Sequence, residues 1–97
     1  MEKLKRVEII VGNYDLHRAI AIAEAAGITG YTIIPDLKGN GERGYRDADG
    51  LTEAFKNSLV LIYCDNEIWL KMQEPLRELL VRIGGLVAIS DCEILMH

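Results

Sequence analysis

Cysteine, histidine and aromatic residues are scarce in this sequence, and each shortage excludes a class of protein. Two cysteines among 97 residues are too few for a disulfide scaffold, so we expect both thiols to be free and buried. No paired cysteine or histidine spacing supports a metal site, and the least poor candidate is Asp91–Cys92 near His97. The single tryptophan and single phenylalanine, Trp69 and Phe55, do not make a stacking platform for nucleic-acid bases.

Long hydrophobic runs and an excess of positive charge are missing too. No segment approaches the ~20 apolar residues of a membrane-spanning helix. The start, Met1–Arg6, leads directly into a strand-like segment and does not resemble a signal peptide. A net charge of −4 argues against general nucleic-acid binding, which needs clustered lysine and arginine. We therefore expect a cytoplasmic protein with a single domain over residues 1–97.

The residues that are present alternate between strand-like and helix-like patterns. Strands are predicted at 6–11, 31–34, 58–64 and 86–89, the last extended or followed by a short fifth strand at 93–96. Helices are predicted after Gly12–Asn13 and after Asp65–Asn66, with apolar stripes at three- and four-residue spacing. Gly27 and Gly84–Gly85 end them, and Pro75 should kink the second helix or mark a fresh start. The order β-α-β-β-α-β predicts an α+β, ferredoxin-like fold, a four-stranded antiparallel sheet with both helices on one face.

The other face of this predicted sheet is not polar enough to face water. Every position of 59–64 is apolar or weakly polar, and Ile10 and Ile33 or Ile34 add to the same side. An exposed apolar sheet of this size is expected to be an interface. The pattern therefore predicts an oligomer.

Between the second and third predicted strands the periodicity disappears over residues 36–55. This stretch holds four glycines and eight charged residues, and loops of such length are usually functional or disordered. Gly39 and Gly41 would let the backbone approach a phosphate, and Arg43 and Arg46 carry planar groups suited to phosphate or carboxylate oxygens. Taken alone, the glycines equally fit a flexible loop that needs turns, and the arginines better fit a solvated loop face on which they pair with Glu42 and Asp47.

The segment Gly27–Ile33, followed by Gly39-Asn-Gly41, resembles the PII signalling family at its helix-to-strand junction and the start of its long T-loop. Residues 39–46 are most similar to the PII-like branch linked to inorganic carbon uptake, which includes carboxysome-associated and SbtB-like proteins. The resemblance implies a homotrimer that binds adenine nucleotide, AMP or ADP, in clefts between subunits, and bicarbonate in some members. It also implies a regulator that is not an enzyme and that signals through the 36–55 loop to a partner, expected to be a membrane bicarbonate transporter.

The resemblance further implies a set of nucleotide-binding residues. These are Thr32, Gly39, Gly41, Arg43, Arg46, Gly84 and Gly85. Thr32 would contact the base, the two arginines the phosphate or bicarbonate, and Gly84 and Gly85 would form the opposite wall from a neighbouring subunit. Standard members carry a phosphate-binding lysine after the second helix, where this chain has Arg82-Ile-Gly-Gly-Leu86, and a loop glutamine where it has Arg43. The implied ligands are therefore AMP or ADP, and not the 2-oxoglutarate of nitrogen sensing.

Two other interpretations stay open. A CutA-like trimer, which shares this fold, would respond to a divalent metal, and an ACT-like module would bind another small ligand. Neither explains the Gly-x-Gly-x-Arg-x-x-Arg pattern at 39–46. Enzymatic activity is not expected, because His17 has no serine or cysteine near it in the sequence to complete a catalytic set.

Overall fold

The computed structural model describes residues 1–37, 40–41, 44–45 and 56–95. In chain order its elements are β1 (Glu2–Gly12), the 3-10 turn η1 (Asn13–Asp15), α1 (Leu16–Ala25), β2 (Thr32–Leu37), β3 (Asn40–Gly41), β4 (Gly44–Tyr45), β5 (Asn57–Cys64), α2 (Asn66–Ile83) and β6 (Leu86–Ile94). The main sheet has the order β2-β5-β1-β6 and all its pairings are antiparallel. The predicted ferredoxin-like fold is confirmed.

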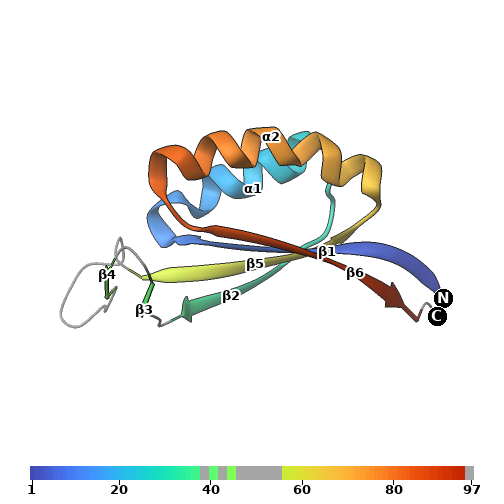
Figure 1. Ribbon diagram of the computed structural model, residues 1–97, viewed down its shortest axis with the longest axis horizontal. Helices are drawn as coiled ribbons and strands as arrows, with labels where there is room; N and C mark the ends of the chain where they lie inside the picture. The colour runs from blue at the N-terminus through green and yellow to red at the C-terminus, as the bar shows by residue number, and fades with distance from the viewer. Residues whose placement is uncertain (38–39, 42–43, 46–55, 96–97) are drawn as a thin grey trace.

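The molecule has two layers, with α1 and α2 on one face of the sheet and none of the described helices on the other (Figure 1). We call the side away from the helices the open face. β1 and β6 continue past the end of β5 as a two-stranded ribbon, pairing from Glu2 opposite Ile94, whereas β5 joins β1 only from Lys5 onward. The N-terminus and the end of β6 lie together at the tip of this ribbon (Figure 1).

The core fills the space between the helices and the sheet. Alternate residues of the two central strands point into it, because successive side chains of a strand face opposite sides. Its largest fully buried side chains are Val7, Ile9, Val11, Ser58, Val60, Ile62, Met72, Leu76 and Leu79. The helix residues among them come from the predicted apolar stripe of the second helix, so this prediction is confirmed.

The second strand is longer than predicted and irregular at its end. β2 runs through Pro35 to Leu37, and its pairing with β5 shifts register between Ile34 and Leu37. Asp36 in this bulge has a positive φ of 60°. Proline is tolerated here because β2 is an edge strand, where one backbone N–H faces away from the sheet.

The second helix begins as predicted but does not restart at its proline. The Asp65 carboxylate accepts a hydrogen bond from the Ile68 backbone N–H at 2.9 Å, which caps the first turn. α2 then continues without a break through Pro75 to Ile83. Pro75 lies on the exposed side of the helix, where the carbonyl of Lys71 can tilt toward water without disturbing the core.

Candidate functional site

Thr32, the predicted base contact, is the first residue of β2 and lies on the open face. It stands directly opposite Leu61 of β5, which stands opposite Glu8 of β1. Its side chain is exposed. The hydroxyl is therefore available to a ligand or to another subunit on this side of the sheet.

Gly84 and Gly85 form the turn between α2 and β6, and both need to be glycine. Their φ angles are +79° and +108°, a region that other residues rarely adopt. The Gly84 N–H ends the helix by donating to the Leu80 carbonyl at 2.8 Å. A Cβ on Gly85 would lie 2.6 Å from the backbone oxygen of Ile10 and 3.2 Å from a methyl of Val11. The turn thus has a structural reason for its glycines, whatever its part in ligand binding.

Thr32 and the Gly84–Gly85 turn lie at opposite edges of one sheet. β2 and β6 are the two edge strands, separated by β5 and β1. At the usual spacing of ~4.8 Å between strands, three intervals place the edges roughly 14 Å apart. Two such edges can bound one narrow cleft if the edge of one subunit meets the edge of another.

The remaining predicted site residues belong to the segment after β2. Gly41 lies in β3 and pairs with Gly44 of β4. Gly39, Arg43 and Arg46 lie outside the described residues, so their roles stay predictions.

Sequence reasoning missed Asn13 and Ser58, whose hydrogen bonds hold the chain in place where it enters β5 after this segment. The Asn13 N–H donates to the Lys56 carbonyl at 2.7 Å, and the Ser58 hydroxyl donates to the Asn13 side-chain oxygen. Ser58 is only 1% exposed. These bonds join the start of β5 to the turn after β1, across 45 positions of sequence. The one sequence signal is a small polar residue at the head of an apolar strand.

Comparison with known proteins decides the family. A family model described as nitrogen regulatory protein P-II matches residues 4–95. The chain belongs to the P-II family. A comparison with curated proteins finds no match.

Solved structures of P-II-like proteins have the same fold. CPII, a nitrogen regulatory PII-like protein from Thiomonas intermedia K12 bound to ADP, AMP and bicarbonate, superposes with a TM-score of 0.88 at 22% identity, over 96% of this chain and 89% of CPII. A PII-like signalling protein from Thermus thermophilus gives 0.75 at 24% identity, over 93% and 87%. GlnK of B. subtilis in complex with ATP gives 0.64 at 12% identity, over 93% and 82%.

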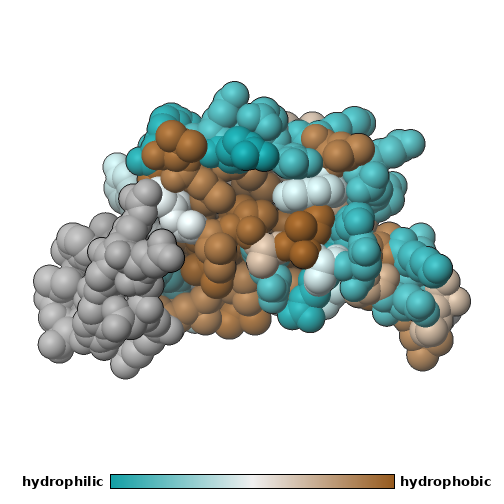
Figure 2. Space-filling model, in the orientation of Figure 1, coloured by the Kyte–Doolittle hydropathy of each residue, from teal (hydrophilic) through white to brown (hydrophobic). Residues whose placement is uncertain are grey.

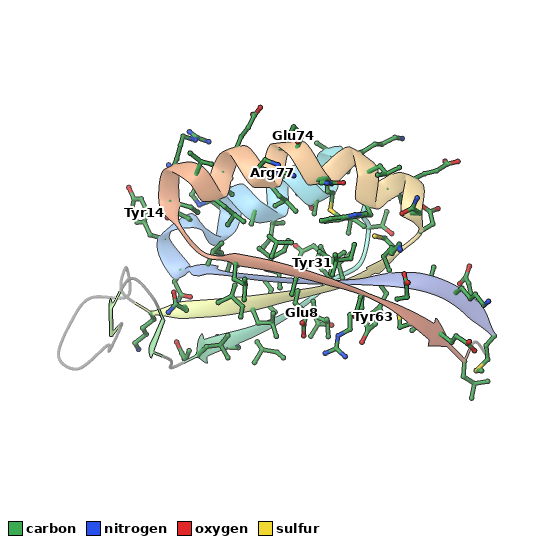
Figure 3. All side chains as sticks on the ribbon, viewed as in Figure 1. Glu8, Tyr14, Tyr31, Tyr63, Glu74 and Arg77 are labelled. Carbon is green, nitrogen blue, oxygen red and sulfur yellow. The ribbon has the colours of Figure 1, made fainter. Side chains whose placement is uncertain are left out.

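The open face of this P-II protein is mostly apolar but carries one charged pair. The Arg6 guanidinium donates to the Glu8 carboxylate at 3.1 Å. Glu8 and Tyr63 point away from the helices (Figure 3). Leu86 and Ile34, at the two edges of this face, are 55% and 42% exposed. Apolar surface continues from beneath the helices across the near edge of the sheet to its open side (Figure 2).

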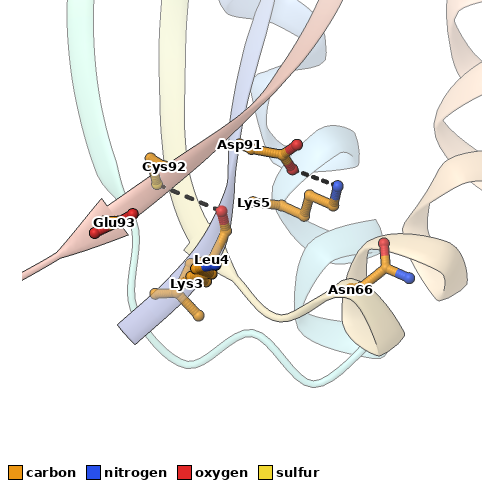
Figure 4. Close-up of a pocket in the computed structure, with 7 residues that line it drawn as sticks. All are labelled: Lys3, Leu4, Lys5, Asn66, Asp91, Cys92 and Glu93. Carbon is orange, nitrogen blue, oxygen red and sulfur yellow. Dashed lines mark hydrogen bonds and ion pairs between the residues drawn. The ribbon is translucent and has the colours of Figure 1, made fainter. Parts of the chain in front are cut away.

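A cavity of about 510 Å³ lies at the ribbon end of the molecule (Figure 4), and neither Thr32 nor the Gly84–Gly85 turn lines it. Its lining residues are Lys3, Leu4, Lys5, Asn66, Asp91, Cys92 and Glu93. Lys5 forms an ion pair with Asp91, and Lys3 lies opposite Glu93, so the charges of the lining balance. This pairing leaves the cavity without a net charge to attract an ion.

The described residues include no ready-made metal site and no helix that could span a membrane. Asp91 of the metal candidate is paired with Lys5, and His97 lies outside the described residues. Among residues that the structure describes, no three histidine, cysteine or acidic side chains gather in a way that could hold a metal ion. Neither α1 nor α2 is long and apolar enough to cross a bilayer.

Proposed function

We propose that the chain is a PII-like regulator that binds AMP or ADP, with bicarbonate as a second ligand, in clefts between the subunits of a homotrimer. The observation that carries this proposal is the P-II family match over residues 4–95. The likeness to CPII, whose structure holds ADP, AMP and bicarbonate, supports the choice of ligands. The placement of Thr32 and Gly85 at opposite edges of the sheet supports a cleft made by two subunits.

The proposal includes how the ligand signal leaves the site. Nucleotide binding would order or release the 36–55 segment, which would contact a partner protein, a membrane bicarbonate transporter. A ligand shifts such an equilibrium only by its difference in affinity for the two states. The bonds of Asn13 to Lys56 and Ser58 support this idea, because they give the segment a fixed exit next to the first helix. We further propose a cytoplasmic, non-enzymatic role.

Calorimetry against AMP, ADP, ATP, bicarbonate and Zn²⁺ tests the ligand class. We expect binding of AMP or ADP, and stronger binding of one of them when bicarbonate is present. Zn²⁺ binding without any nucleotide binding would favour a CutA-like metal response and contradict the proposal. Light scattering on the same samples should give three times the mass of one chain.

Variants of the two loop arginines test the site itself. Arg43→Ala and Arg46→Ala should each weaken AMP or ADP binding tenfold to a hundredfold, because a charge-assisted hydrogen bond contributes about 1.5–3 kcal/mol. Arg→Lys should restore part of the affinity, since the guanidinium fork is lost. Lys71→Ala on the exposed side of α2 is the control and should change nothing. If both arginine variants bind nucleotide as well as the wild type, the site assignment is wrong.

A further inference from the structure

Arg6 and Glu8 are two charged side chains on the open face, each next to apolar or aromatic residues. Both belong to β1, a central strand of the sheet. Arg6 stands between Tyr63 of β5 and Ser90 of β6, and Glu8 stands between Leu61 of β5 and Ala88 of β6. Their side chains are 42% and 37% exposed, so more than half of each is already removed from water.

The hydrogen bonding of this pair is incomplete within one chain. One bond joins them, from an Arg6 terminal nitrogen to a Glu8 oxygen at 3.1 Å. The Arg6 Nε is buried and, among the described residues, is the one buried side-chain nitrogen or oxygen without a partner. A guanidinium has five N–H donors and a carboxylate about four acceptor positions, so most of their capacity is unused.

Covering the open face would remove the water that now reaches the exposed parts of these two side chains; the Arg6 Nε is already out of its reach. Burying a charged group without hydrogen-bonding partners is costly, and losing one partner of a buried pair costs far more than removing both. Whatever packs on this face must therefore bring an acceptor to Arg6 and a donor to Glu8. A second copy of the chain brings one of each.

We infer that Arg6 of each subunit pairs with Glu8 of the next subunit around the ring. The inference rests on the proposed homotrimer and adds to it the contact that fixes how neighbours align. A head-to-tail contact repeated by a closed rotation pairs each Arg6 with the Glu8 of one neighbour, so every Arg6 and every Glu8 is used once and no charge is left unpaired. The Cα atoms of Arg6 and Glu8 are two positions apart on one strand, roughly 7 Å, and two long side chains can span such a distance.

Conservative variants of each residue test the contact first. Arg6→Met keeps the aliphatic stem of the side chain, and Glu8→Gln keeps its shape. Each should raise the trimer dissociation constant roughly 30-fold or more, as expected when one partner of a buried charge pair is lost. The matched control is the exposed Glu74–Arg77 pair on the outer side of α2, joined at 3.4 Å (Figure 3). Glu74→Gln and Arg77→Met should leave the dissociation constant unchanged.

Mixing the two variants separates a contact between subunits from one within a chain. In a mixed trimer, the contact at which an Arg6→Met subunit precedes a Glu8→Gln subunit has neither charge, and the contact in the opposite order has both. The third contact still lacks one charge, so one unpaired charge remains, against three in a trimer of either variant alone. Mixed trimers should therefore form at concentrations where either variant alone is dissociated, and native mass spectrometry should find them above the random proportion. If the pair acts only within each chain, mixing restores nothing, and the inference is overturned.

The Arg6–Glu8 contact and the proposed ligand binding can be refuted independently of each other. A wild-type protein that binds nucleotide as a trimer, with no rescue on mixing, refutes the Arg6–Glu8 contact alone. A wild-type monomer refutes both the proposed trimer and this contact. Circular dichroism of each variant before mixing shows that loss of assembly is not loss of folding.

Discussion

The two faces of the sheet are built from the same strands, but their side chains are buried to different extents. On the helix-covered side, Ile9 and Ile62 are fully buried, whereas on the open face Ile10 and Leu61 are only partly buried. A sheet with one face in water normally alternates apolar and polar residues. β5 does not, and this difference is a physical reason for the proposed trimer, in which other subunits would cover the open face.

The largest difference between the faces should appear when the same charge is placed on each. Ile62→Asp puts a carboxylate into the core, where Ile62 has no exposure at all. Burying one unpaired charge costs several kcal/mol, comparable with the ~5–15 kcal/mol that stabilises a whole domain. We expect the chain to be largely unfolded at 25 °C by circular dichroism. A cooperative thermal transition like that of the wild type would show that the two faces are not distinct.

One residue earlier, the same change should separate the subunits and leave the fold. Leu61 lies on the open face opposite Glu8 and Thr32, so Leu61→Asp leaves the core intact and adds a second carboxylate beside Glu8. We expect sedimentation to show monomers at micromolar concentration, with the helical signal retained. Leu70→Asp, at a position 58% exposed on α2, is the control and should remain assembled. A Leu61→Asp protein as large as the wild type would mean that the open face is not the interface.

The sequence was sufficient for the order of the four main-sheet strands and the two helices, but not for the short β3–β4 pair or for every boundary. β1 begins at Glu2, four residues before the predicted start, because its first residues are mostly charged and lack the alternation that reveals a strand. β2 passes Pro35, since an edge strand tolerates a residue that cannot donate to the ladder. The choice between Ile33 and Ile34 for the open face needed the register, which places Ile34 opposite Leu59.

The residues of the candidate site also fall into those that the sequence could predict and those that it could not. Thr32 and the glycine turn could be placed from local patterns, since a strand start and a helix end are both short-range signals. The Ser58–Asn13 bond could not, because its partners are 45 residues apart and no spacing rule joins them. The sequence could not predict the burial of the Arg6 Nε either, because that burial depends on the packing of β5 and β6 on either side of β1.

The smallest expected effect concerns the two cysteines, one on each face. Both are free thiols, Cys64 buried on the covered side and Cys92 partly exposed on the open face, opposite Leu4. Burial, with a smaller contribution from the nearby Asp65 carboxylate, raises the pKa of the Cys64 thiol. Since the thiolate is the reactive form, a thiol reagent at pH 8 should label Cys92 roughly tenfold faster or more, and denaturant should equalise the two.

Because folding raises the pKa of Cys64, the free energy of unfolding also depends on pH. The unfolded thiol loses its proton at the ordinary pKa of about 8.5, before the folded one does. The contribution of Cys64 to the free energy of unfolding is therefore complete below that pH and is lost as the pH rises through the folded pKa. Urea unfolding of wild type and Cys64→Ala at pH 7 and pH 9.5 measures it, and the wild type should lose more stability between the two. Labelling of Cys64 as fast as Cys92 in the folded protein would contradict the assignment of Cys64 to the covered face.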